Sequence, residues 1–208
     1  MTDPITTIIF DFGNVLLGWD ARKLYNRLLP DPETVDRFLK QISFADWNAK
    51  QDAGRPFRDG VAELSSQFPQ HAELIQAYDT YWEESLTGTI DGTIEIVQEL
   101  KEAGWPLYLL SNFSVEKFEL IRDRHTYLDL FNDIIISGEY GIVKPDPAIF
   151  HIALERMNKK ASECLFIDDS QANINTASSL GLQTIHFHSP AQLRTELIKY
   201  SIKGLKSS

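Results

Sequence analysis

The chain has little of what marks secreted, membrane or nucleic-acid-binding proteins. Its one cysteine, Cys164, cannot form an internal disulfide and lies within an apolar run, as expected of a small core residue in a reducing compartment. No apolar run approaches the roughly 20 residues needed to span a bilayer. Residues 1–6 have no basic segment followed by an apolar one, so a signal peptide is not expected. We therefore expect a cytoplasmic protein with no membrane partner.

Basic charge is also scarce. Twenty lysines and arginines stand against thirty acidic residues, which gives a formal net charge of −10. Such a surface repels nucleic acid and anionic membranes, so neither is expected as a partner. An anionic substrate would need a metal ion and a few well-placed donors to overcome this background.

Three common catalytic signatures are missing. The sequence has no Gly-x-Gly-x-x-Gly after a strand, no phosphate-binding loop with Gly-Lys-Ser or Gly-Lys-Thr, and no His-Glu-x-x-His. Their absence argues against a nicotinamide enzyme, a nucleotide-triphosphate enzyme and a zinc protease. His186 and His188 have strand spacing that places both rings on one face, but without a third ligand we interpret them as structural.

What is present is an alternation of short apolar runs with helical patterns. The apolar runs predict strands at 7–10, 107–110, 133–136, 164–167 and 184–187. Helical patterns lie near 94–104 and at 115–124, 147–157, 171–180 and 190–200. Strands that alternate with helices predict βαβ units and a parallel sheet with right-handed crossovers.

A helical segment separates the first strand from this alternating part. Apolar residues recur at helical spacing in 35–42, 57–68 and 74–82, and no strand is expected between 17 and 85. The sequence therefore predicts an α/β core domain of residues 1–16 and 87–208. A compact helical domain of residues 17–86 is inserted directly after the first strand.

Polar residues follow the predicted strands at the points where the strands end. In chain order they are Asp11, Ser111, Asn112, Lys144, Asp168 and Asp169. Because the carboxyl ends of parallel strands open onto one edge of a sheet, we expect these side chains to converge there.

This set of side chains suits phosphoryl transfer. A carboxylate such as Asp11 can attack phosphorus and split hydrolysis into the formation and breakdown of an aspartyl-phosphate. Mg²⁺ prefers oxygen ligands, which the three carboxylates and a turn carbonyl near Gly13 offer. Ser111 and Lys144 are suitable donors to phosphate oxygens.

In these residues the sequence resembles the haloacid dehalogenase-like (HAD) hydrolase superfamily. The matching motifs are, in chain order, Asp11-Phe12-Gly13-Asn14-Val15, Ser111-Asn112, Lys144-Pro145 and Asp168-Asp169. The resemblance implies a three-layer Rossmann-like parallel sheet with a small α-helical cap, as in subfamily IA of the superfamily. Within it, Phe-Asp-Phe-Gly-Asn-Val, Leu-Ser-Asn and Phe-Ile-Asp-Asp most resemble the bacterial α-D-glucose-1-phosphate phosphatase group.

The resemblance also implies a metal site and a nucleophile. Asp11 would be the nucleophile and a Mg²⁺ ligand, with Gly13 lending its backbone carbonyl. Asp169 would be the second metal carboxylate, and Asp168 would bind directly or through water. Which of these two aspartates binds more directly is left open.

The same resemblance implies how a phosphate ester would be held. Ser111 and the backbone of Asn112 would bind the phosphoryl group, and Lys144 would neutralise it and so take part in catalysis. In the helical segment, Arg55 lies in a Gly-Arg-Pro loop and is the residue there that we expect to contact the substrate.

One position departs from the pattern of the superfamily. Most of its phosphatases have a second aspartate two residues after the nucleophile, as general acid and base, whereas this sequence has Gly13. The backbone carbonyl remains for the metal, but the proton shuttle is missing. We predict that Asp20 takes over this catalytic role or positions a water; the alternative is that it caps the helix starting at Ala21.

The sequence thus predicts a Mg²⁺-dependent phosphatase that hydrolyses a small phosphorylated metabolite such as glucose 1-phosphate. A metal-independent 2-haloacid dehalogenase shares the aspartate nucleophile, but Asp168 and Asp169 beside an anionic substrate argue for a cation. The other alternative is a weakly active protein that binds a phosphorylated metabolite, which Gly13 keeps open. The oligomeric state is not determined by these patterns.

Overall fold

A parallel sheet forms the centre of the molecule. The computed structural model describes residues 4–206, and within that range five parallel strands lie in the order β5-β4-β1-β6-β7. The strands are β1 (Thr7–Phe10), β4 (Leu107–Ser111), β5 (Asp133–Ile136), β6 (Cys164–Asp168) and β7 (Gln183–His186). All five predicted strands are confirmed, each to within one residue at either end.

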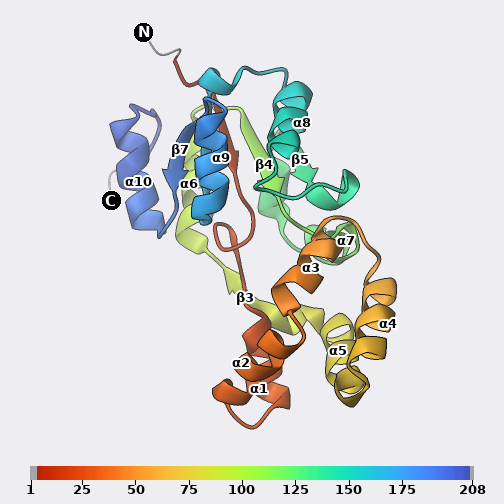
Figure 1. Ribbon diagram of the computed structural model, residues 1–208. Coiled ribbons are helices and arrows are strands. Elements are labelled where there is room, and N and C mark those ends of the chain that lie inside the picture. The colour runs from red at the N-terminus through yellow and green to blue at the C-terminus, as the bar shows by residue number, and fades with distance from the viewer. Residues whose placement is uncertain (1–3, 207–208) are drawn as a thin grey trace.

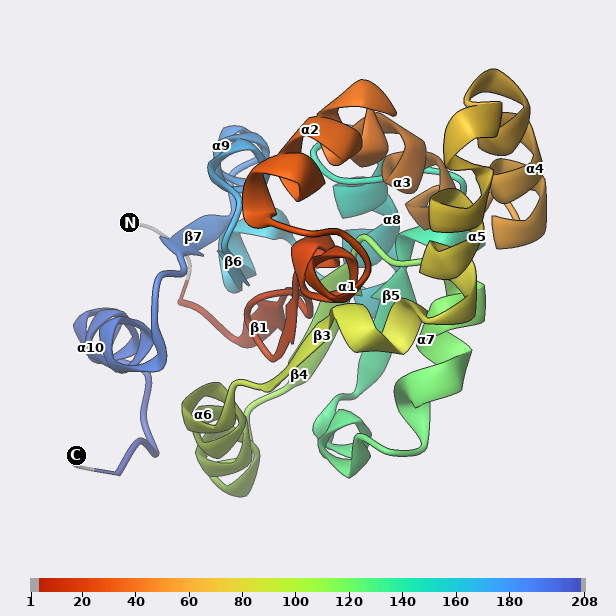
Figure 2. The ribbon, with the colours of Figure 1, turned by 90° about the horizontal axis from the view of Figure 1, so that it is seen from below.

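Both faces of the sheet are buried, because successive side chains of a strand point to opposite faces. Ile8 and Phe10 belong to a core shared with α6 and α10, whereas Ile9 belongs to a second core shared with α8 and α9. The helices are α6 (Asp91–Glu102), α7 (Val115–Arg122), α8 (Pro147–Met157), α9 (Gln171–Ser179) and α10 (Pro190–Lys199). Figure 2 shows α6 and α10 on one side of the strands and α8 and α9 on the other. The predicted three-layer α/β fold is confirmed.

A helical segment extends from one end of the sheet (Figure 1). Its α-helices are α1 (Ala21–Leu28), α2 (Pro32–Gln41), α3 (Phe44–Asp52), α4 (Phe57–Gln67) and α5 (Ala72–Thr80). Their aromatic residues meet around Tyr78, whose ring contacts those of Tyr25, Phe44, Trp47 and Phe57. Every helix found within residues 4–206 is too short or too polar to cross a membrane.

An antiparallel ribbon connects this helical segment to the sheet. β2 (Leu17–Trp19) pairs with β3 (Leu86–Thr89). The prediction of no strand between 17 and 85 was therefore wrong at its first residues. A strand of three residues with a central glycine, Gly18, is too short to show an alternating pattern.

Helix α3 was not singled out by apolar spacing, because a polar residue lies on its buried face. Gln51 is fully buried, and its Nε2 donates to the backbone oxygen of Trp47 at 2.6 Å. Its Oε1 accepts from Arg55 Nε, also at 2.6 Å. Both ends of the glutamine amide are therefore hydrogen-bonded inside the helical segment, which allows a polar side chain to be buried there.

The C-terminal end of α3 lies against the loop after β5. Ser137 Oγ donates to the backbone oxygen of Asp52 at 2.5 Å and accepts from the backbone N–H of Phe113 at 2.9 Å. A Cβ on Gly54, whose φ is +90°, would lie 2.5 Å from the backbone oxygen of Gly138. Glycine is required for this approach, both for its φ and for its lack of a side chain. These contacts hold α3 over the edge where the strands end.

Candidate active site

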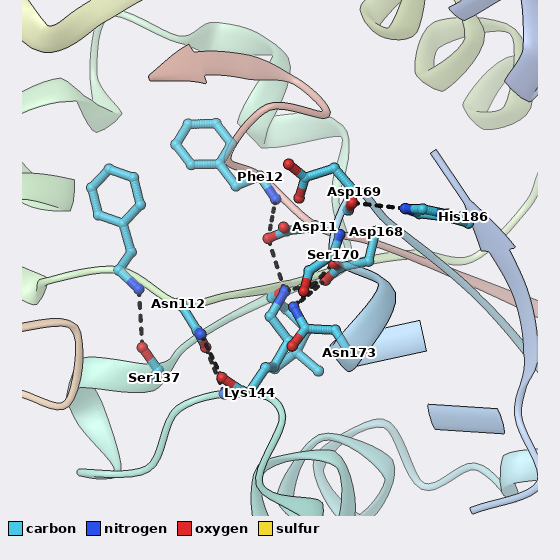
Figure 3. Close-up of polar contacts among 12 residues, drawn as sticks. Asp11, Phe12, Asn112, Ser137, Lys144, Asp168, Asp169, Ser170, Asn173 and His186 are labelled. Carbon is cyan, nitrogen blue, oxygen red and sulfur yellow. Dashed lines mark hydrogen bonds and ion pairs between the residues drawn. The ribbon is translucent and has the colours of Figure 1, made fainter. Parts of the chain in front are cut away.

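A buried ammonium group lies between two carboxylates at the carboxyl edge of the sheet (Figure 3). Lys144 Nζ is 2.9 Å from Asp11 Oδ1 and 2.7 Å from Asp168 Oδ2, and it donates to the backbone oxygen of Leu110 at 2.8 Å. All three of its N–H groups are thus used inside the protein. Burial alone would lower the pKa of Lys144, but the two carboxylates outweigh it and hold the pKa above its usual value. The lysine therefore stays charged.

The order of the strands brings these groups together. β1 pairs with β6 on one side and with β4 on the other, so Asp11, Asp168 and Ser111 end three adjacent strands. Lys144 reaches them from the loop after β5 through its bonds to Asn112. Its backbone N–H donates to Asn112 Oδ1 at 2.7 Å, and Asn112 Nδ2 donates to its backbone oxygen at 2.8 Å. The side chain of Asn112 thus positions Lys144.

Three carboxylates converge on one point. Asp11, Asp168 and Asp169 each offer an oxygen within 4.8 Å of the others. Burial raises the pKa of Asp11 to about 7; Lys144 opposes this shift and the two other aspartates add to it. Burial, and then the charge of Asp168, also raise the pKa of Asp169. Negative charge is therefore costly here, and the hard oxygen donors fit a cation such as Mg²⁺.

Asp168 and Asp169 have different surroundings. Asp168 is fully buried, and its oxygens accept from Lys144, from the backbone N–H of Ser170 and from Asn173 Nδ2. Asp169 is less buried, and its backbone oxygen is 2.9 Å from His186 Nε2. The side chain of Asp169 therefore keeps more of its acceptor capacity for a ligand.

Ser111 and Gly13 affect how an anion would bind at this site. The hydroxyl of Ser111 is buried and has no hydrogen-bond partner among residues 4–206. Such a hydroxyl is destabilising unless something binds it, and an oxygen of a bound anion is a suitable acceptor. At Gly13 an added Cβ would meet nothing within 4 Å, so there is room for the side chain that this position lacks.

A cavity of about 300 Å³ joins these residues to the helical segment. On the side of the sheet it is lined by Asp11, Gly13, Asn112, Lys144 and Asp169. From the helical segment and its ribbon it is lined by Trp19, Asn48, Asp52, Phe57 and Trp82. The volume lies at the lower end of the roughly 300–1,000 Å³ typical of small-molecule sites.

Four predicted site residues lie outside the lining of this cavity. Two of them, Ser111 and Asp168, are buried at the ends of β4 and β6. The other two belong to the helical segment and its ribbon. Asp20 is the N-cap of α1, where its side chain accepts from the backbone N–H of Arg22 at 2.9 Å. Arg55 binds Gln51 and Glu63 and so connects α3 to α4. The capping alternative for Asp20 is thus observed, whereas its catalytic role and the substrate contact of Arg55 stay predictions.

Sequence reasoning missed four residues of the site. Asn48 and Asp52 stand four apart on α3, a spacing that places both on one helical face. Lys117 lies on α7 and lines the same cavity. Asn173 follows Asp168 by five residues and binds both of its oxygens at 3.0 Å. Only the spacing of Asn48 and Asp52 was visible in the sequence.

A parallel α/β sheet with carboxylates converging at its edge is a typical place for an active site, and the class of the enzyme follows from the family of the chain. The family model of haloacid dehalogenase-like hydrolases matches residues 5–181. The chain belongs to this family.

Curated relatives and solved structures agree with this assignment. The chain is 32% identical over 189 residues to the GMP/IMP nucleotidase YrfG of Escherichia coli, covering 83% of this chain and 81% of the relative. It is 25% identical over 204 residues to the D-ribitol-5-phosphate phosphatase of Bacteroides thetaiotaomicron, covering 93% and 97%. It spans only 36% of the length of another relative, the drimenol cyclase drtB of Aspergillus calidoustus, at 26% identity over 199 residues and 93% of this chain.

Among solved structures, a HAD family enzyme of Bacteroides thetaiotaomicron in complex with magnesium and inorganic phosphate has a similar fold. Its TM-score is 0.70, with 22% sequence identity over 89% of this chain and 95% of that one. At this identity the similarity shows a shared fold.

Proposed function

We propose that this chain is a Mg²⁺-dependent phosphatase of small phosphate monoesters, with Asp11 as its nucleophile. One observation carries the proposal: a fully buried Lys144 joins Asp11 to Asp168, and Asp169 completes a set of three carboxylates within 4.8 Å. A bound divalent cation would balance these charges, and an oxygen of a phosphate group would accept a hydrogen bond from the hydroxyl of Ser111. Relatives named as a nucleotidase and a phosphatase, and a neighbour that binds magnesium and phosphate, support it.

The reaction proceeds in two displacements at phosphorus. A carboxylate oxygen of Asp11 bonds to phosphorus while the bond from phosphorus to the ester oxygen breaks, and the departing oxygen takes a proton from Asp20 or from a water that Asp20 positions, so that the alcohol leaves. A water molecule then gives a proton back to the same group and bonds to phosphorus, the bond to Asp11 breaks, and inorganic phosphate leaves. Lys144 neutralises charge on the phosphoryl oxygens, and the hydroxyl of Ser111 donates to one of them. Bound Mg²⁺ supplies further positive charge for these oxygens.

The metal ligands in this proposal are Asp11, the backbone carbonyl of Gly13 and Asp169. Asp168 acts less directly, because Lys144, Ser170 and Asn173 already occupy its oxygens. Its role is then to hold Lys144 in place and to bind the metal through water.

A sugar phosphate is the substrate that we propose, following the resemblance to subfamily IA and the α-D-glucose-1-phosphate phosphatase group. A sugar 1-phosphate has a better leaving group than a plain alkyl ester. It therefore depends less on the general acid that Gly13 does not provide.

We also propose that residues 17–86 act as a cap domain over a core of residues 1–16 and 87–208. The cavity is lined from both parts, so closure of the cap would exclude bulk water from the phosphate ester. Asp20 as acid and base, and Arg55 as a substrate ligand of the opened cap, belong to this proposal.

Phosphate release tests the proposed function. We would measure it for a panel of sugar phosphates, including α-D-glucose 1-phosphate, and for p-nitrophenyl phosphate, with Mg²⁺ and with excess chelator. The expected result is release that requires Mg²⁺, is lost in Asp11→Asn and persists in Asp129→Asn, an exposed aspartate in the turn before β5.

Two other outcomes would contradict the phosphatase proposal and support one of the alternative functions. Chelator-insensitive turnover of a 2-haloacid without phosphate release would indicate the dehalogenase alternative. Thermal stabilisation by a phosphate ester without any turnover would indicate the binding-protein alternative.

A further inference from the structure

The part of the cavity that comes from the cap is aromatic apart from a few polar side chains. Its aromatic residues are Trp19, Phe57 and Trp82. The polar side chains from cap helix α3 are Asn48 and Asp52. A cavity of this kind is typical of small-molecule sites, in which a few placed polar groups determine which ligand is accepted.

Asp52 is fixed between the cap and the core. Its Oδ2 accepts from Asn48 Nδ2 at 3.0 Å, its carboxyl accepts from the backbone N–H of Ser114, and its backbone oxygen accepts from Ser137 Oγ. Burial raises the pKa of Asp52 to about 7, and the two hydrogen bonds to its carboxyl oppose this shift only in part.

Asp52 forms no ion pair with any residue in the described part of the chain. Asp52 is only partly buried, but a carboxyl that is shielded from water without a cation is still less stable than one in water. Two hydrogen bonds leave acceptor capacity on its oxygens, and the side chain lines the cavity. A ligand in the cavity is the natural partner for that capacity.

Lys117, from the core, determines which kind of partner fits. Its Nζ donates to the backbone oxygen and to Oδ1 of Asp79, at 3.1 and 2.6 Å, and lies 4.3 Å from the centre of the Phe57 ring. These bonds use two of its three N–H groups. Because the charge of Lys117 is already balanced by Asp79, what this lysine offers to a ligand in the cavity is an N–H donor for an oxygen atom.

The polar groups of the cavity therefore include both donors and an acceptor. Asn48 and Lys117 each keep an N–H group, and Asp52 keeps acceptor capacity. A hydroxyl group both donates and accepts, so it matches such a mixed set. The aromatic surface fits the C–H face of a ring or short carbon chain, and a volume of about 300 Å³ is sufficient for a small molecule such as a monosaccharide.

We infer that Asp52 is a specificity-determining residue that selects leaving groups with hydroxyls, so that the substrate is the phosphate ester of a polyol or monosaccharide. This inference rests on the proposed function and names the substrate class of that same site. Asp52 would accept a hydrogen bond from a substrate hydroxyl, while Asn48 and Lys117 donate to neighbouring oxygens.

Matched pairs of esters with and without hydroxyls test this inference. The pairs are α-D-glucose 1-phosphate with cyclohexyl phosphate, and a pentitol 5-phosphate with n-pentyl phosphate. We expect the wild type to prefer the hydroxylated member of at least one pair by about a hundredfold or more in kcat/KM, because unpaired polar groups of a site reject the hydroxyl-free analogue.

The variant Asp52→Asn separates a specificity role from a structural one. We expect it to reduce the preference by about tenfold or more, mainly through KM of the hydroxylated ester, because a hydrogen bond to a charged group is lost. The control is Asp46→Asn, which changes an exposed carboxylate on the same helix and should retain the wild-type preference.

Three results would overturn the inference. They are a wild type without preference in either pair, an Asp52→Asn variant that slows both members of a pair equally, and faster turnover of phosphoethanolamine than of any hydroxylated ester. If the Asp52→Asn variant does not fold, the preference of the wild type for hydroxylated esters over hydroxyl-free esters still tests the inferred substrate class. Failure of the proposed function would look different: no ester, p-nitrophenyl phosphate included, would release phosphate in a Mg²⁺-dependent manner.

Discussion

Replacing Lys144 by methionine would test the charge balance at the sheet edge independently of any substrate. The change keeps an unbranched side chain that is one atom shorter, and it removes the charge. In the wild type, Nζ is 2.7 Å from Asp168 and 2.9 Å from Asp11, and the side chains of Lys144 and Asp168 are fully buried. The variant would therefore leave two close carboxylates without a cation and the backbone oxygen of Leu110 without its donor.

The size of the effect follows from these contacts. At 2.8 Å and an effective dielectric constant of 20, the attraction of one such pair is about 6 kcal/mol, most of which desolvation offsets. Removal of one member of a buried ion pair costs about 3–5 kcal/mol in the free energy of unfolding, because the remaining charge stays buried. At about 2–4 °C per kcal/mol, the midpoint of thermal unfolding should fall by roughly 6–20 °C.

Urea unfolding in excess chelator would measure this loss. The control is Lys50→Met, an exposed lysine whose Nζ lies 3.8 Å from Glu63, for which a loss of only about 0–1 kcal/mol is expected. In the double variant with Asp168→Asn, part of the stability should return, because one buried charge is removed. A Lys144→Met protein within about 1 kcal/mol of Lys50→Met would refute the reasoning.

Three further predictions concern single residues. Gly13→Asp should fold, since a Cβ there meets nothing within 4 Å. By supplying a general acid, it should raise kcat for alkyl phosphates by a factor that is about 10² or more larger than the factor for aryl phosphates. If kcat for alkyl phosphates does not rise, the wild type does not lack a general acid. Asp20→Ala should lower the free energy of unfolding by about 0.5–2 kcal/mol, whereas Asp20→Ser should not, because serine is also a good N-cap residue. If kcat falls in both variants, the loss is independent of capping and the acid–base role is established. Gly54→Ala should destabilise the protein more than Gly88→Ala in urea unfolding, because both glycines have positive φ but only the first would press a Cβ against backbone; equal losses would contradict this.

The strands and the main site residues could be predicted because their signals are local. A buried parallel strand needs only four or five apolar residues in a row, so β1 and β6 were visible without knowledge of their neighbours. Asp11 and Asp168 were visible for the same reason, since each follows such a run directly. The sequence predicts that Lys144 lies near these two aspartates, but the ion pairs and their distances come only from the structure.

The helical segment was harder to predict because its signals are not local. Strand β2 forms because it pairs with β3, and the five α-helices α1 to α5 lie between these two strands in the sequence. Helix α3 buries Gln51, whose amide is satisfied by Trp47 and Arg55, so its apolar pattern is interrupted. Short strands and buried polar residues become stable only through partners that are distant in the chain.

The sequence by itself determined the class of the fold, the place of the helical insertion and the polar residues that meet at the strand ends. Only the tertiary structure decided which residues of the helical segment reach the cavity: Arg55, the residue expected there, binds Glu63, while Asp52 lies against the core. The physical reason is that a motif at a strand end is positioned by its own strand. A specificity residue is positioned by packing between two parts of the chain, which no local pattern records.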